Sequence, residues 1–198
     1  LDTPLEVPEG ARSVGIRGDL ELRPAEPYTP AGELSDDYRC FLIDPAIEGE
    51  RFFTGYQLAP GNLNIVHHII LFGITEAGRS AAETKDAADA ADGWPCFGDV
   101  GLPGVESSVG VSWTPGEGAV KFPEGTGVPV DDDTLFVLQV HYNLAAGVGA
   151  DRSSARLELS EPGAALTPLV SLDLLAPVEL PCPAGEKSEA CSREHALE

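Results

Sequence analysis

The chain alternates between short apolar runs and turns rich in Pro and Gly. The strongest run covers residues 134–142, and the run over residues 64–72 is apolar on both of its alternating faces. A segment of the second kind is typical of a strand buried between two layers. Further runs predict strands over residues 14–22, 38–43, 51–58, 155–159 and 166–175.

One segment, residues 80–92, has the pattern of a helix. Ser80 and Glu83 have the spacing of a capping box, the interior is rich in Ala, and Gly93 with Pro95 follows as a stop signal. Three aspartates in the C-terminal half of the segment oppose the helix dipole. We therefore expect this helix to be short and exposed.

Several short strands, a single helix and no strand–helix–strand alternation indicate the fold class. The pattern predicts an all-β fold, an antiparallel β-sandwich of the jelly-roll type, with one short helix in a loop excursion. The length of 198 residues suits one domain. We expect this domain over residues 1–175, followed by a tail over residues 176–198 that has little strand signal.

Both ends of the chain carry signs of processing. The chain begins at Leu1 and contains no Met, which indicates a mature or trimmed chain. The final Leu197-Glu198 resembles a remnant of cloning before an affinity tag, so we leave it out of the fold argument.

The charge of the chain excludes some classes of partner. Twelve Lys and Arg stand against 33 Asp and Glu, which gives a formal net charge of −21 and a pI near 4.3. Such a surface repels phosphate backbones, so nucleic acids and anionic membranes are poor candidates, and solubility is the simplest reason for the acidity. No run of 18 apolar residues occurs, so we expect no membrane span.

The cysteines indicate the compartment. Cys40, Cys96, Cys182 and Cys191 include no C-x2-4-C spacing, which disfavours a cysteine zinc site. Two disulfides and an extracytoplasmic location, secreted or periplasmic, are the better interpretation. Within the tail, Cys182 and Cys191 are expected to close a small loop.

The histidines point to a metal. Three of the four, His67, His68 and His141, lie in the two most apolar strands, whereas His195 lies in the charged tail and is expected to play no part. A buried imidazole is costly unless its nitrogens are satisfied, and either a metal or backbone hydrogen bonds satisfy them. Three imidazoles suit Cu, Zn, Ni or Fe, and the ligand type does not choose between them.

The adjacent pair poses a geometric problem. Neighbouring side chains on a regular strand point to opposite faces, so His67 and His68 share one ion only if the strand twists or bulges there. Gln139 lies on the same face of its strand as His141, where it either orients a ligand or a metal-bound water, or lines a solvated edge. Tyr38 shares a face with Cys40, a position at which an aromatic residue is more often core than site.

Other chemistries lack their motifs. The chain has no G-x-S-x-G elbow, no P-loop and no H-E-x-x-H, so serine hydrolases, nucleotide-binding proteins and zincins are disfavoured. The aspartates at 131–133 lack the spacing of an EF-hand and are expected to form a solvated turn.

Four segments occur in an order and at intervals that point to a known family. They are Asp-Tyr-Arg-Cys at 37–40, Val-His-His-Ile-Ile-Leu-Phe-Gly at 66–73, Phe-Pro-Glu-Gly-Thr-Gly at 122–127 and Leu-Gln-Val-His-Tyr at 138–142. Together they resemble the N-terminal domain of the copper type II, ascorbate-dependent monooxygenases, typified by peptidylglycine α-hydroxylating monooxygenase and dopamine β-monooxygenase. The resemblance covers about residues 12–160.

The resemblance implies a jelly-roll domain in which His67, His68 and His141 hold an electron-transferring copper. In the family this copper receives electrons from ascorbate and passes them to a second copper on a following domain, where O₂ is activated and a substrate C–H bond is hydroxylated. By the same resemblance Gln139 and Tyr38 lie near the first copper. It also implies a disulfide between Cys40 and Cys96, which leaves Cys182 to pair with Cys191.

The chain also departs from the family. The second copper needs an H-x-H pair and a Met ligand, and this sequence has neither. Ile74 stands where the family has a cysteine of another disulfide. We therefore expect a copper-binding, electron-transfer domain that holds one copper, is not competent for hydroxylation by itself, and works with a second copper domain or partner protein. The alternatives are a copper-binding or interaction module without turnover and a three-histidine zinc site with hydrolytic chemistry.

Overall fold

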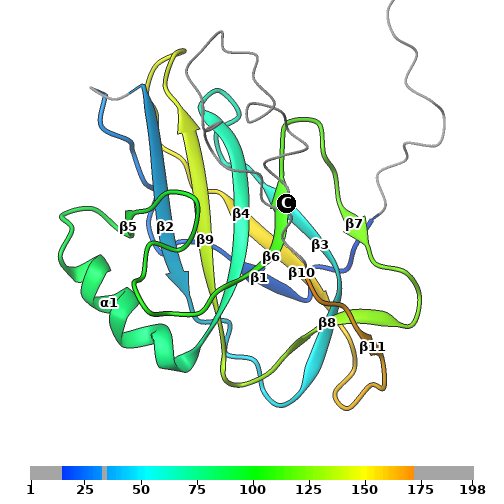
Figure 1. Ribbon diagram of the computed structural model, residues 1–198. Helices are drawn as coiled ribbons and strands as arrows, with labels where there is room; N and C mark the ends of the chain where they lie inside the picture. The colour runs from blue at the N-terminus through cyan, green and yellow to red at the C-terminus, as the bar shows by residue number, and fades with distance from the viewer. Residues whose placement is uncertain (1–14, 33–34, 172–198) are drawn as a thin grey trace, which may run out of the picture.

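The computed structural model describes residues 15–32 and 35–171, and it is a sandwich of two β-sheets (Figure 1). The predicted all-β sandwich with one short helix is confirmed. We call the sheets the front sheet and the back sheet. The front sheet has the order β5 (Trp94–Pro95), β2 (Asp36–Ile43), β9 (Thr134–Asn143), β4 (Val66–Thr75) and β6 (Ser108–Trp113), and all its pairs are antiparallel.

The back sheet is made of shorter strands. Its order is β1 (Leu20–Leu22), β10 (Ser154–Leu159), β3 (Arg51–Ala59), β8 (Thr126–Val130) and β11 (Thr167–Pro168), and β7 (Val120–Lys121) also pairs with β3. The pair of β11 and β8 is parallel, and the other pairs in this sheet are antiparallel.

The main core lies between the sheets. Strand β9 alternates, and its Phe136, Leu138, Val140 and Tyr142 are buried in this core. Burial of each large apolar side chain contributes roughly 1.5–3 kcal/mol, so this strand is a major source of stability. The core also includes Leu22, Phe41, Phe53, Leu58, Ile69, Leu71, Trp113 and Leu157.

A second core covers the other face of the front sheet. Leu135 and Val137 of β9 pack there with Phe72 of β4, beneath Trp94 and residues of the following loop. Strands β9 and β4 are therefore buried on both faces over most of their length, as the apolar run over residues 64–72 predicts for β4. This second core extends as far as Cys96. The three histidines lie beyond it, at the end of the front sheet.

The helix differs from its prediction at both ends. A 3-10 turn, η1 (Glu76–Gly78), leads into helix α1 (Arg79–Ala87), and no side chain caps the first turn of α1. The predicted capping box is wrong, because Ser80 already lies inside the helix, where its carbonyl accepts a hydrogen bond from Thr84. The helix begins early because the Arg79 guanidinium at its start pairs with Glu76 in the preceding turn and with Asp44, which follows β2.

The helix also ends five residues before the predicted position. The aspartates that oppose its dipole bind elsewhere: an Asp86 oxygen accepts the backbone N–H of Gly93, and Asp89 pairs with Arg39 of β2. These contacts draw the chain away from the helix axis and toward the edge of the front sheet.

Several predicted strands are shorter than their apolar pattern. Within the described range, Leu20–Leu22 are the only residues of 14–22 that form a strand, and Thr167–Pro168 are the only ones of 166–175. Strands β6 and β8 are missed by the sequence pattern, because Gly and Pro interrupt their alternation.

The disulfide between Cys40 and Cys96 that the resemblance implies is confirmed. It ties β2 to the residue that follows β5. The predictions for Cys182, Cys191, His195 and the end of the chain fall outside the described residues. Within residues 15–32 and 35–171 no helix has the length and apolar character needed to cross a membrane.

Candidate metal centre

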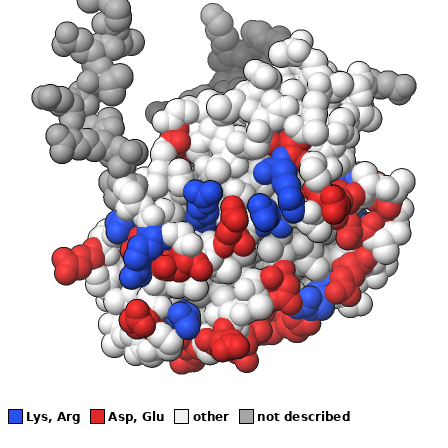
Figure 2. Space-filling model, turned by 180° about the vertical axis from the view of Figure 1, so that it is seen from behind, with Lys and Arg blue, Asp and Glu red and all other residues white. Residues whose placement is uncertain are grey.

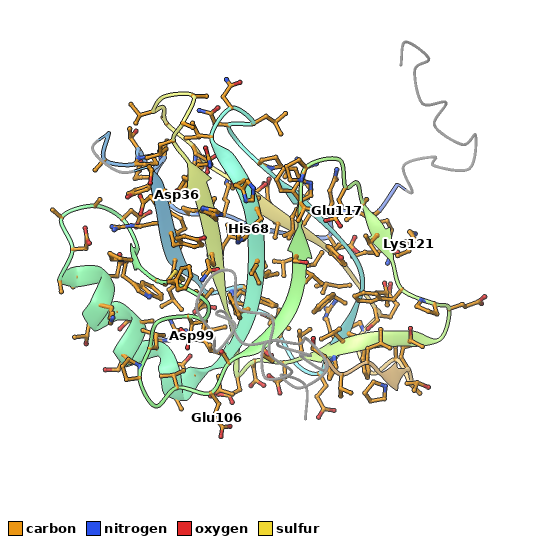
Figure 3. The ribbon with its side chains drawn as sticks, turned by 45° about the horizontal axis from the view of Figure 1, so that its top comes forward. Asp36, His68, Asp99, Glu106, Glu117 and Lys121 are labelled. Atoms are coloured by element: carbon orange, nitrogen blue, oxygen red, sulfur yellow. A yellow bond between two sulfur atoms is a disulfide. The ribbon has the colours of Figure 1, made fainter. Side chains whose placement is uncertain are left out.

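A bulge in β4 brings the adjacent histidines together. Val66 pairs with Tyr142 and His68 pairs with His141, so that His67 is an extra residue with no partner on β9. The bulge that the sequence requires for a shared site is therefore present. The three imidazoles are neighbours, with ring centroids 4.7–5.5 Å apart. Figure 3 shows His68 on β4, beside β9.

The ring nitrogens have the spacing of ligands to one ion. Nδ1 of His68 lies 3.3 Å from Nδ1 of His67 and 3.2 Å from Nδ1 of His141. All three ligand atoms lie within 4.8 Å of one another. Two nitrogens at tetrahedral positions 2.0–2.1 Å from a metal are about 3.3 Å apart, so the two distances from His68 fit a single ion.

A carboxylate determines which nitrogen of His141 is available. Nε2 of His141 lies 2.9 Å from Oδ1 of Asp36, at the start of β2. We assign the proton to Nε2, which donates it to the carboxylate, so that Nδ1 keeps its lone pair for a metal. This hydrogen bond is the main reason why the pKa of Asp36 lies below its ordinary value.

Sequence reasoning missed Asp36. The signal was present, because Asp36 is two residues before Tyr38 and therefore shares its face of β2. That face is the one from which Tyr38 reaches His141. The prediction needed the register between β2 and β9, which a single sequence does not provide.

Tyr38 packs directly against a metal-ligand candidate. It is the cross-strand partner of His141, and the two rings stack with centroids 4.0 Å apart and planes 6° apart. Phe97 and Tyr38 form a T-shaped pair, with their ring centroids 4.8 Å apart. The His141 ring is thus held by a stack on its face and by Asp36 at one nitrogen, which restricts its rotation.

Gln139 shares the face of His141 as predicted, but its hydrogen bonds go to the neighbouring loop. Its Nε2 donates to the carbonyl of Asp99 at 2.8 Å and lies 3.4 Å from Sγ of Cys96. The side chain is only 1% exposed. In this position Gln139 fixes the loop that follows the disulfide, and a role in orienting a ligand stays a prediction.

The protonation state of His68 favours metal binding. His67 is exposed, His68 is half-buried and His141 is buried. Burial, followed by the nearby His141 and His67, lowers the pKa of His68 to about 4. His68 is therefore neutral at pH 7, and among the described residues its Nδ1 is approached only by the other two histidines.

A β-sandwich that gathers three imidazoles at the end of one sheet is compatible with a metal-binding domain that uses histidine ligands. Residues 29–148 match the family described as copper type II ascorbate-dependent monooxygenase, N-terminal domain. The match includes more than half of the chain, and the protein belongs to this family. No curated protein matches the chain. The family and the three-histidine cluster together support copper as the metal.

Proposed function

We propose that this domain holds one copper ion through His67, His68 and His141 and serves as a one-electron transfer centre. The convergence of three Nδ1 atoms from a bulged strand and its neighbour carries the proposal. Copper at such a site would alternate between Cu(I) and Cu(II), with ascorbate as a possible reductant. Neutral nitrogen ligands suit both oxidation states.

The surrounding residues hold the ligands in place. Asp36 fixes the tautomer of His141, and Tyr38 restrains the plane of its ring. Gln139 and the disulfide at Cys96 hold the loop on which Phe97 lies. A ligand set fixed in this way needs little rearrangement when an electron arrives, which is the property required of an electron-transfer centre.

The sequence lacks the H-x-H pair and the Met that the resemblance implies for a second copper, and the reaction of the family needs that copper. His195 is the only histidine besides the three described, and the chain contains no Met. We infer that the chain by itself does not hydroxylate a substrate. A second copper domain or a partner protein would supply that step.

The domain bounds and the location complete the proposal. We assign the copper domain to residues 1–175 and a tail with a Cys182–Cys191 loop to residues 176–198. The disulfide between Cys40 and Cys96 supports an extracytoplasmic location, secreted or periplasmic.

Anaerobic copper titration, with electron paramagnetic resonance before and after ascorbate, tests the proposal. We expect one type 2 copper per chain, with nitrogen hyperfine structure that disappears on reduction. Copper that ascorbate reduces without substrate oxidation in any mixture would favour the binding module. Failure to bind stoichiometric copper, or ready displacement of copper by equimolar zinc, would contradict the proposal and favour the zinc site.

A further inference from the structure

A groove opens along one side of the sandwich, between the edges of the two sheets. Strand β6 is the last described strand of the front sheet, and β8 with β11 forms the corresponding edge of the back sheet (Figure 1). Two adjoining cavities, of about 340 Å³ and about 470 Å³, lie between these edges. They share Ser108, Gly110, Val128 and Pro129 in their walls, so together they form one continuous groove.

The groove is lined mainly by apolar side chains. Its inner end reaches the main core at Phe53, Val130 and Phe136, and its outer end is bordered by Phe122 and Leu169. Within the part of the chain that the structure describes, β6 has a strand neighbour on one side only. Natural proteins cover an open strand edge beside apolar side chains, because such an edge otherwise pairs with other chains. We therefore expect an occupant in the groove.

The outer face of the back sheet differs from the groove, because it is charged. Lys121 and Arg156 lie on strands of this sheet, and they form ion pairs with Glu158 and Glu21. Figure 2, which views the molecule from behind, shows Lys and Arg interspersed with Asp and Glu. A surface of this composition is stable in water, so this side of the sandwich needs no cover.

The chain itself enters the groove at the end of the described residues. Thr167 and Leu169 donate their N–H groups to the backbone carbonyls of residues 125 and 127, at 2.9 and 2.8 Å, so the chain follows β8 as far as Leu169. Residues 169–171 then line the outer cavity together with residues of β6. Val170 is 88% exposed there. The covalent chain therefore continues from a point inside the groove.

The next residues have the sequence of a strand that would fill the groove. Residues 172–176 read Leu-Asp-Leu-Leu-Ala, in which Leu172 and Leu174 alternate with Asp173, and Pro177 follows as a stop signal. They continue the apolar run for which the sequence predicts a strand up to residue 175. Five extended residues span about 17 Å and the six residues of β6 span about 20 Å, so the lengths are similar.

We propose that residues 172–176 lie in this groove as an added strand beside β6, with Leu172 and Leu174 directed inward and Asp173 directed to solvent. The apolar lining of the groove then packs against two leucines of the same chain, and the free edge of β6 gains a partner. The segment thereby blocks pairing of β6 with a second copy of the chain. It also holds the start of the tail against the sandwich.

Hydrogen–deuterium exchange of the full chain, followed by mass spectrometry, tests the proposal. The variant carries Leu172→Asp and Leu174→Asp together, because two carboxylates are costly to bury against apolar side chains. In the wild type we expect slow exchange over residues 108–113 and over residues 172–176. In the variant the amides of both segments should exchange faster, by on the order of tenfold. Equal exchange over residues 108–113 in the two proteins would overturn the proposal.

The matched control carries Val178→Asp and Leu180→Asp, which add the same charge beyond Pro177. This control should exchange like the wild type over residues 108–113, and equal acceleration in both variants would mean that added charge alone is the cause. Copper stoichiometry should be the same in all three proteins. Ile74 and Thr134 of the groove lie at the opposite ends of β4 and β9 from the histidines, so the inference is independent of the copper function.

Photo-crosslinking identifies the occupant without any destabilising charge. The residue p-benzoylphenylalanine replaces Leu174 in a mixture of light and isotopically heavy chains, and mass spectrometry maps the cross-linked peptides. We expect cross-links within one chain, to residues 108–113 or 126–130. Cross-links to these strands between light and heavy chains would show that a second copy fills the groove. Cross-links that avoid both strands would show that the segment lies elsewhere, and either result would overturn the proposal.

Discussion

The carboxylate of Asp36 accepts a hydrogen bond from Nε2 of His141 at 2.9 Å, and it thereby turns the other nitrogen of that ring toward His67 and His68. Carboxylates that hold metal-binding histidines in this way raise the basicity of the ligand and fix its orientation. The two residues come from neighbouring strands, so the pairing of β2 with β9 also sets the geometry of the site.

Removal of the Asp36 carboxylate is expected to weaken copper binding. In Asp36→Ala the His141 ring loses the partner that fixes its tautomer, and affinity should fall by roughly 10–100-fold. The fold should persist, because the Asp36 side chain is 44% exposed. The measurement is competition for copper with a chelator of known affinity. Asp132→Ala is the control, and an Asp36→Ala affinity equal to that of the control would exclude this role.

Removal of His141 is expected to abolish stoichiometric copper binding. In His141→Ala two imidazoles remain, and both come from the bulge in β4. Metal analysis after gel filtration gives the copper content, and circular dichroism checks the fold. His195→Ala is the matched control, because His195 lies in the charged tail of the sequence. One copper per chain in folded His141→Ala would refute the assignment of this ligand.

The metal-free chain should become less stable as pH falls from about 6.5 to about 4. The pKa of His68 is lowered to about 4 in the folded chain, against 6.5 for the ordinary residue. Between these values the unfolded chain binds more protons than the folded chain, so the free energy of unfolding rises with pH there. The melting temperature across this range, measured for the wild type and for His68→Gln, checks the prediction.

The comparison isolates the contribution of one ring from that of the many carboxylates. Carboxylates titrate in both proteins, so they largely cancel in the difference. The His68→Gln variant should show a weaker loss of melting temperature between pH 6.5 and pH 4. Parallel curves for the two proteins would mean that His68 titrates normally.

We expect that replacement of Gly93, which lies three residues before Cys96, destabilises the fold. Its φ is +77°, and an added Cβ would lie 2.3 Å from the carbonyl oxygen of Cys40, with Phe41 also too close. Gly93→Ala should therefore destabilise the chain by more than the roughly 1–2 kcal/mol of left-handed strain alone. Urea denaturation measures the loss.

Gly98→Ala is the matched control for that strain. Gly98 has a φ of +79°, but nothing lies within 4 Å of an added Cβ. This variant should lose only the strain energy, so the difference between the two variants measures the steric contact. Equal losses in both variants would show that the backbone at Gly93 moves to accept the methyl group.

The strands that form the site follow from local pattern, and the contacts between them do not. Residues 134–142 have the apolar alternation that places Gln139 and His141 on one face, and the structure agrees. A site shared by the adjacent histidines requires a twist or a bulge, because a regular strand would separate them, and the structure contains the bulge. The partner of His141 depended on how β2 pairs with β9, and Asp36 was therefore missed.

The ends of the elements depend on tertiary contacts. Ser80 and Glu83 have the spacing of a capping box, but the ion pairs of Arg79 start the helix one residue earlier. Asp89 stays outside the helix because Arg39 on a distant strand binds it. Side chains from elsewhere in the chain thus override the local propensity at both ends.

X-ray absorption spectroscopy of the copper-loaded chain tests the central claim most directly. The account predicts three nitrogen scatterers at about 2 Å with the outer-shell pattern of imidazole, in a sample that contains one copper per chain. A sulfur scatterer, or fewer than three imidazoles in a fully loaded sample, would contradict the three-histidine centre.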